Sequence, residues 1–130
     1  MMRLLGEQLG VELAPTVMRF NGRTRVELDG ADPARTVLVE SWARIGLPKP
    51  AHHKKVLADA LKLSWVAGQL EQRPDRLVLL MGDEAAARPF VEGSGWGARA
   101  ITDLGVEVIV VTLPTEVKAD VATAQRLQYR

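Results

Sequence analysis

The chain has 130 residues, of which 47% are hydrophobic and 25% charged, and its formal net charge is +1 at pH 7. These values are ordinary for a globular protein and argue against wholesale disorder, and the length predicts a single domain over residues 1–130. There is no cysteine, which excludes disulfides, thiolate zinc sites, iron–sulfur clusters and a cysteine nucleophile.

The sequence carries no signal for a membrane. No apolar run approaches the roughly 20 residues that a membrane-spanning helix needs. Residues 1–7 hold one positively charged side chain and no long apolar core, unlike a secretory signal peptide. We therefore expect a cytoplasmic protein without a membrane partner.

The N-terminal half predicts a short helix followed by a meander of three antiparallel strands. Leu5 and Leu9 have the i, i+4 spacing of one helix face. The dipeptide Asn21-Gly22 favours the positive φ angles of a tight hairpin turn. The helix is expected over residues 4–9 and the strands over residues 17–20, 24–29 and 36–43.

The C-terminal half predicts alternating helices and strands. Glycine and prolines at residues 46–50 break the meander, and the two later strands are almost entirely apolar, as in parallel strands that are covered on both faces. Helices are expected over residues 51–71, 84–91, 96–104 and 115–130, and strands over 76–81 and 106–112. The chain should therefore form an α/β fold whose mixed central sheet, an antiparallel meander followed by βαβαβ units, is flanked by helices.

Glu40 is an unusual residue in this pattern. It follows three apolar residues, 37–39, in a strand that should be central, where a lone carboxylate is costly to bury. Asp29 ends the neighbouring predicted strand, and pairing across residues 30–35 would bring both acids together. Two such oxygen ligands suit a hard cation, Mg²⁺ or alternatively Mn²⁺, and Glu7 would supply a third. Alternatively, Glu40 lies at an exposed strand end and pairs with Arg44 or Lys54.

The helix expected over residues 51–71 is preceded and lined by basic residues. Lys55, Asp59 and Lys62 have the i, i+4, i+7 spacing of one polar stripe. Beside a carboxylate cluster, these lysines would contact phosphate and stabilise developing charge. On a solvated face, each ion pair would stabilise the helix by only about 0.2–0.5 kcal/mol. The sequence leaves both interpretations open.

The order of a helix with an acid, a strand with Asp29, a strand with Glu40 and then further helices and strands resembles the restriction-endonuclease-like superfamily, the PD-(D/E)xK nucleases. Their motif is an acid on one strand and (D/E)-x-K on the next, often with a glutamate from the preceding helix. The resemblance covers residues 3–113 by pattern. It implies that Asp29 is the first acid, residues 40–42 the tripeptide, and Glu7 the helix acid.

The sequence departs from this motif at Trp42, which occupies the position of the lysine. The resemblance then implies one of two functions. Either Lys55 or Lys62 replaces that lysine in a Mg²⁺-dependent endonuclease, a hydrolase of DNA in which Arg44, Lys49 and Lys54 contact the DNA backbone. Or the chain is a catalytically degenerate protein that binds nucleic acid or another protein, as a homodimer or as a subunit of a larger complex.

Overall fold

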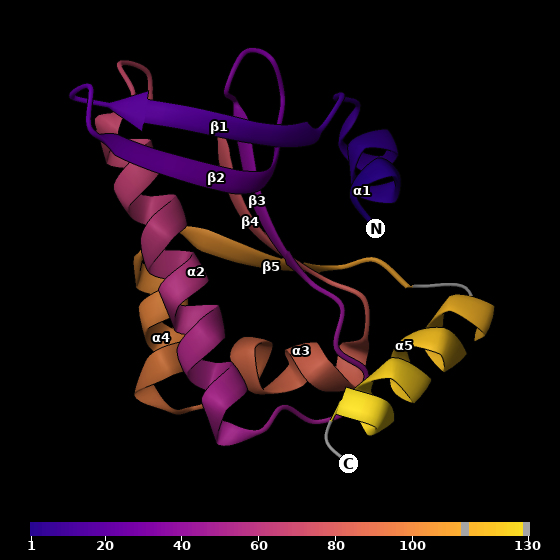
Figure 1. The fold of residues 1–130 in the computed structure, drawn as a ribbon. Helices are drawn as coiled ribbons and strands as arrows, with labels where there is room; N and C mark the ends of the chain where they lie inside the picture. The colour runs from indigo at the N-terminus through magenta and orange to yellow at the C-terminus, as the bar shows by residue number, and fades with distance from the viewer. Residues whose placement is uncertain (113–114, 129–130) are drawn as a thin grey trace.

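The computed structural model describes residues 1–112 and 115–128, which form a five-stranded sheet flanked by helices (Figure 1). Every predicted element is present, with its ends moved by no more than three residues, except that residues 129 and 130 of the last predicted helix lie outside the described ones. In chain order the elements are α1 (Met2–Leu9), β1 (Ala14–Phe20), β2 (Thr24–Ala31), β3 (Val37–Trp42), α2 (Pro50–Gln69), β4 (Arg76–Met81), α3 (Glu84–Val91), α4 (Trp96–Asp103), β5 (Val106–Val110) and α5 (Thr115–Gln128).

The strands lie in the sheet in the order of the chain, β1-β2-β3-β4-β5. The pairs β1–β2 and β2–β3 are antiparallel, while β3–β4 and β4–β5 are parallel. Asn21 and Gly22, with φ angles of 54° and 70°, make the turn between β1 and β2, as the sequence predicted. The mixed α/β sheet with its meander and two crossovers is therefore confirmed.

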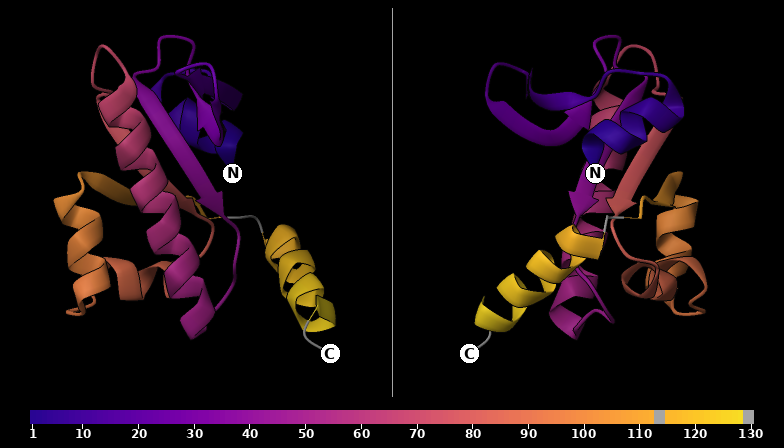
Figure 2. Two further views of the ribbon diagram at one scale, coloured as in Figure 1. Left: turned by 60° about the vertical axis from the view of Figure 1, so that its left-hand side comes forward. Right: turned by 90° about the vertical axis from the view of Figure 1, so that its right-hand side faces the viewer.

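The helices divide unequally between the two faces of the sheet. Two successive crossovers of the same hand place their helices on one face, and α2, α3 and α4 lie together there (Figure 2). α1 packs on the other face, where Leu5 contacts the cluster that includes Val37 and Val39. Because side chains alternate along β3, Leu38 and Glu40 point to the α2 face.

α2 is the helix that matters most for the site. Pro50 occupies its first turn, and the Lys49 backbone N–H donates to Nδ1 of His52 at 2.9 Å, while the His52 N–H donates to the Lys49 carbonyl. A buried seam along the helix packs against the sheet. It contains Val56, Ala60, Leu63, Val66 and Ala67.

α5 lies beyond the end of β3, away from the other helices (Figures 1 and 2). The side-chain amide of Gln125 joins it to the loop after β3: the Ile45 N–H donates to Oε1 at 2.9 Å and Nε2 donates to the Ile45 carbonyl at 3.2 Å. Neither α5 nor any other helix within residues 1–112 and 115–128 has the length and hydropathy needed to cross a membrane.

Candidate functional site

The site begins with an irregularity in β2. The pairing of β1 with β2 changes register between Ala14↔Ala31 and Thr16↔Leu28, so β2 holds one extra residue, a β-bulge. Leu28 and Ala31, three residues apart, consequently both reach the core on the α2 face. Bulges bend a strand and redirect its side chains, and this one lies at Asp29.

β2 and β3 pair only over two residues on the C-terminal side of the bulge. Their ladder contains only Gly30↔Val39 and Ala31↔Leu38. Beyond it, the side chain of Asp29 takes the place of a strand partner: the Ser41 N–H donates to Oδ2 of Asp29 at 2.8 Å, and the Ser41 hydroxyl lies 3.4 Å from the same oxygen. This arrangement brings the Asp29 carboxylate within hydrogen-bonding reach of the Glu40 carboxylate.

Glu40 is only 5% exposed, so the alternative of an exposed strand end is wrong. Its Oε1 lies 2.7 Å from Nζ of Lys62, whose side chain is 35% exposed and reaches from α2 toward β3. The two predicted acids and one of the predicted lysines therefore form a single cluster, which we call the acid–lysine cluster: Asp29, Glu40 and Lys62.

The two acids of this cluster have opposite pKa shifts. Burial raises the pKa of Glu40 to about 7; the Lys62 ammonium opposes this rise, and the neighbouring Asp29 adds to it. Burial would also raise the pKa of Asp29, but the hydrogen bond from Ser41, the contact with Glu40 and the charge of Lys62 outweigh it and lower that pKa. The two carboxyls therefore differ in acidity, and Glu40 is the one that holds a proton more readily.

Trp42 fills the place where the motif lysine was expected. Its ring packs beside those of His52 and Phe90, with centroid separations of 5.4 and 6.2 Å, at the edge of the main core. A lysine there would lose its hydration among aromatic rings. In this chain the ammonium beside the second acid comes instead from Lys62.

Two other predicted site residues lie away from the cluster. Glu7 is on α1, which packs on the opposite face of the sheet, and it pairs with Arg3 at 3.8 Å. The structure therefore does not bring the expected third carboxylate to the acidic pair. Nζ of Lys55 lies 2.8 Å from Oδ2 of Asp59, so Lys55 makes the i, i+4 ion pair on α2 that the sequence left as an alternative, and only Lys62 of the predicted stripe reaches the acids.

The residues predicted to contact nucleic acid follow the end of β3. Arg44 is half-buried and donates from Nε to the Leu47 carbonyl at 3.3 Å. Lys49 and Lys54 are exposed at the start of α2. Arg44 and Lys49 line a common hollow with α5, whereas Lys54 does not.

Sequence reasoning missed the second buried acid, Asp32, which is 4% exposed. Its carboxylate accepts hydrogen bonds from the Thr36 and Val37 backbone N–H groups at 2.7 and 2.8 Å, and from the Thr36 hydroxyl. These donors close the loop before β3. An aspartate that precedes proline and stands four residues before threonine was the available signal for such a turn.

The acid–lysine cluster offers two carboxylates as ligands for a metal ion. Within residues 1–112 and 115–128, no group of three or more His, Asp or Glu side chains is arranged to hold one. Mg²⁺, however, commonly keeps several waters and uses only one or two carboxylates together with substrate phosphates. Asp29 and Glu40 fit that donor set.

Comparisons with protein families, with curated proteins and with solved structures find no match to this chain.

Proposed function

We propose that this protein is a metal-dependent nuclease of the restriction-endonuclease-like superfamily that hydrolyses DNA phosphodiester bonds at the acid–lysine cluster. One observation carries the proposal. Although Trp42 replaces the lysine of the motif, the Lys62 ammonium lies 2.7 Å from the carboxylate of Glu40. The three groups that the motif combines, two acids and a lysine, are thus present together.

Each residue has a definite part in this chemistry. Asp29 and Glu40 would hold Mg²⁺ or Mn²⁺, which when bound activates water and stabilises charge on the phosphate. The Ser41 N–H fixes the orientation of Asp29. Lys62 offers an ammonium next to the carboxylates, where it can orient a water molecule and offset negative charge on the phosphate oxygens.

The buried pair is better explained by such a role than by stability. Desolvation offsets most of the attraction within a buried ion pair, and the raised pKa of Glu40 means that folding disfavours its charged form. Strongly shifted pKa values are common where a protein binds or transforms a ligand. Because the cation would bind the ionised carboxylate, its binding should release the Glu40 proton and strengthen as the pH rises through about 7.

The decisive experiment compares DNA cleavage by matched variants. Supercoiled and single-stranded DNA are incubated with Mg²⁺ or Mn²⁺ and with the wild type, Glu40→Gln or Lys62→Met. Loss of a charge-stabilising donor typically lowers rates by about 10²–10³-fold, and we expect losses of this order. Lys55→Met is the control, because that lysine pairs with Asp59 on the same helix, and its rate should stay within about twofold. Equal cleavage by wild type and Glu40→Gln would identify a contaminating nuclease and refute the proposal.

A second candidate function is a nuclease-like protein that binds nucleic acid or another protein without cutting, as a homodimer or within a larger complex. The position of Trp42 favours it, as does the absence of a third carboxylate beside Asp29 and Glu40 among residues 1–112 and 115–128. Thermal unfolding at pH 8 separates the candidates. A melting temperature that rises with Mg²⁺ in the wild type but not in Glu40→Gln supports the metal site, whereas DNA binding with neither a shift nor cleavage supports the second candidate.

A further inference from the structure

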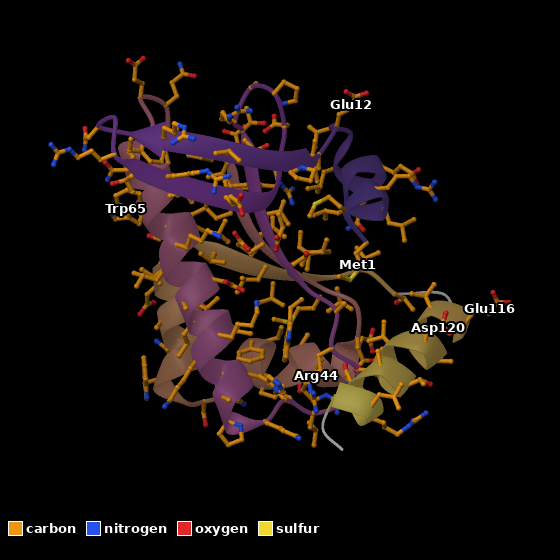
Figure 3. All side chains as sticks on the ribbon, viewed as in Figure 1. Met1, Glu12, Arg44, Trp65, Glu116 and Asp120 are labelled. Atoms are coloured by element: carbon orange, nitrogen blue, oxygen red, sulfur yellow. The ribbon has the colours of Figure 1, made fainter. Side chains whose placement is uncertain are left out.

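A basic hollow lies between the loop after β3 and helix α5. Its volume is about 330 Å³, and the described residues that line it are Arg44, Lys49, Ala122, Gln125 and Arg126. Three of these five carry positive charge, and none of the described ones is acidic. Figure 3 shows Arg44 beside the C-terminal part of α5. Arg126 was not among the residues that the sequence suggested, because it is about 80 positions away from the others.

The loop that carries these cations is fastened at two points. The amide of Gln125 bonds both backbone groups of Ile45. The Gly46 N–H donates to Oδ2 of Asp83 at 2.9 Å, and that oxygen also caps α3 by accepting from the Ala86 N–H. The backbone between Arg44 and Lys49 is therefore held in place before a ligand arrives, which lowers the entropic cost of binding.

The two arginines retain donors for a ligand. Among the described residues, Arg44 is hydrogen-bonded through Nε to the Leu47 carbonyl and Arg126 through one terminal nitrogen to the Thr123 hydroxyl. A guanidinium has five N–H donors in a planar fork that matches phosphate oxygens. Nearby His52 also responds to this charge: burial lowers its pKa, and the positive charges of Arg44 and Lys49 lower it further.

The hollow is close to the acid–lysine cluster along the chain. Arg44 follows Glu40 by four residues, so their Cα atoms are at most about 13 Å apart at 3.3 Å per extended residue. The phosphates of one DNA strand follow each other every 3.4 Å or so along the helix axis. This separation is short enough for one strand to span the cluster and the hollow within a few nucleotides.

We infer that Arg44, Lys49 and Arg126 form a binding site for a backbone phosphate of the nucleic acid on which the acid–lysine cluster acts. This inference rests on the proposed function for the identity of the ligand. The hollow is large enough for a phosphate group, and its cations come from both the β3–α2 loop and α5. Lys49 would act as a point charge, while the arginines fix the orientation of the phosphate.

Fluorescence anisotropy with labelled DNA tests the site without cleavage. Single-stranded and duplex oligonucleotides are titrated in EDTA with the wild type, Arg44→Gln, Arg126→Gln and the control Arg99→Gln on the exposed side of α4. Losing one phosphate contact should weaken binding about eightfold at 0.1 M salt and reduce the slope of log K against log[salt] by about one. The control should stay within about twofold of wild type. Arg126→Lys should keep the salt slope and lose part of the affinity.

The outcomes separate this inference from the proposed function. If Arg44→Gln and Arg126→Gln bind DNA as Arg99→Gln does, the phosphate site is refuted even if the wild type cuts DNA. If both weaken binding while the wild type does not cut, the phosphate site holds and the nuclease proposal fails. Vesicles containing phosphatidylserine form a third arm, because Leu47 and Leu127 are exposed close to the hollow. Binding to these vesicles that exceeds binding to DNA and depends on the same arginines would refute the nucleic-acid assignment.

Discussion

Two carboxylates near β3 are buried, one in the loop before the strand and one within it, and they differ in their partners and in the direction of their pKa shifts. Asp32, before the strand, is 4% exposed and accepts hydrogen bonds from backbone and hydroxyl donors. Glu40, within the strand, is 5% exposed and faces another acid and a lysine. Burial would raise the pKa of Asp32, but the donors of Thr36 and Val37 lower it, whereas the pKa of Glu40 rises to about 7.

This difference teaches that burial of an acid does not by itself indicate a functional site. Fixed backbone donors satisfy the charge of Asp32 completely, so it stabilises the fold and has little left to offer a ligand. The surroundings of Glu40 leave its charge only partly compensated, and a cation would complete them. The partners of each carboxylate, rather than its exposure, separate the structural acid from the candidate catalytic one.

The largest expected effect on stability comes from Asp32→Ala. It leaves the N–H groups of Thr36 and Val37 without their acceptor, and hydrogen bonds to charged groups contribute about 1.5–3 kcal/mol each. We expect the free energy of unfolding to fall by about 4 kcal/mol at pH 7 in urea titrations, with Asp75→Ala as an exposed control. Because the pKa of Asp32 is lowered in the folded state, the loss should shrink as the pH falls below the ordinary aspartate range.

A smaller and opposite effect is expected for Glu40→Gln. The raised pKa means that Glu40 favours folding below its unfolded value of 4.5, and that this contribution disappears as the pH rises through about 7. Between pH 5 and pH 8, the free energy of unfolding of the variant should therefore rise relative to that of the wild type by roughly 2–3 kcal/mol. This value follows from about 1.4 kcal/mol per pKa unit. Urea titrations at both pH values measure this gain, with Glu71→Gln as an exposed control. A variant that loses stability at pH 8 would make Glu40 a structural acid like Asp32.

The smallest effect is expected for Lys55→Ala. Lys55 pairs with Asp59 on the exposed side of α2, and such i, i+4 pairs contribute about 0.2–0.5 kcal/mol. Thermal unfolding in low and high salt should show a loss within this range that high salt removes. A fall in the free energy of unfolding of more than about 1 kcal/mol would show that Lys55 contributes more than a surface ion pair.

Local patterns were sufficient to predict the elements of this fold. The alternation of residues 36–43, the helical spacing in residues 51–71 and the turn at Asn21-Gly22 each depend on near neighbours in the chain, and each is observed. The same alternation predicted that Glu40 shares a face with Leu38. Because the pleat of a strand fixes the direction of its side chains, the sequence by itself identified Glu40 as the unusual residue of this strand.

The tertiary structure alone decided which residues join Glu40. Simple alternation separates Asp29 from Leu28, and only the bulge in β2, a product of pairing with β1, turns Asp29 toward Ser41 and Glu40. Because of the way α2 packs across the sheet, Lys62 contacts Glu40, whereas Lys55 contacts Asp59 on its own helix.

The side of the sheet on which α1 packs kept Glu7 away from the acids, and the docking of α5 brought Arg126 to Arg44. These outcomes depend on contacts between segments far apart in the chain, which periodicity and spacing do not encode. The sequence determined that a carboxylate stands at Glu40 on the same face of the strand as Leu38, and the tertiary structure determined its burial and the partners that give it its chemistry.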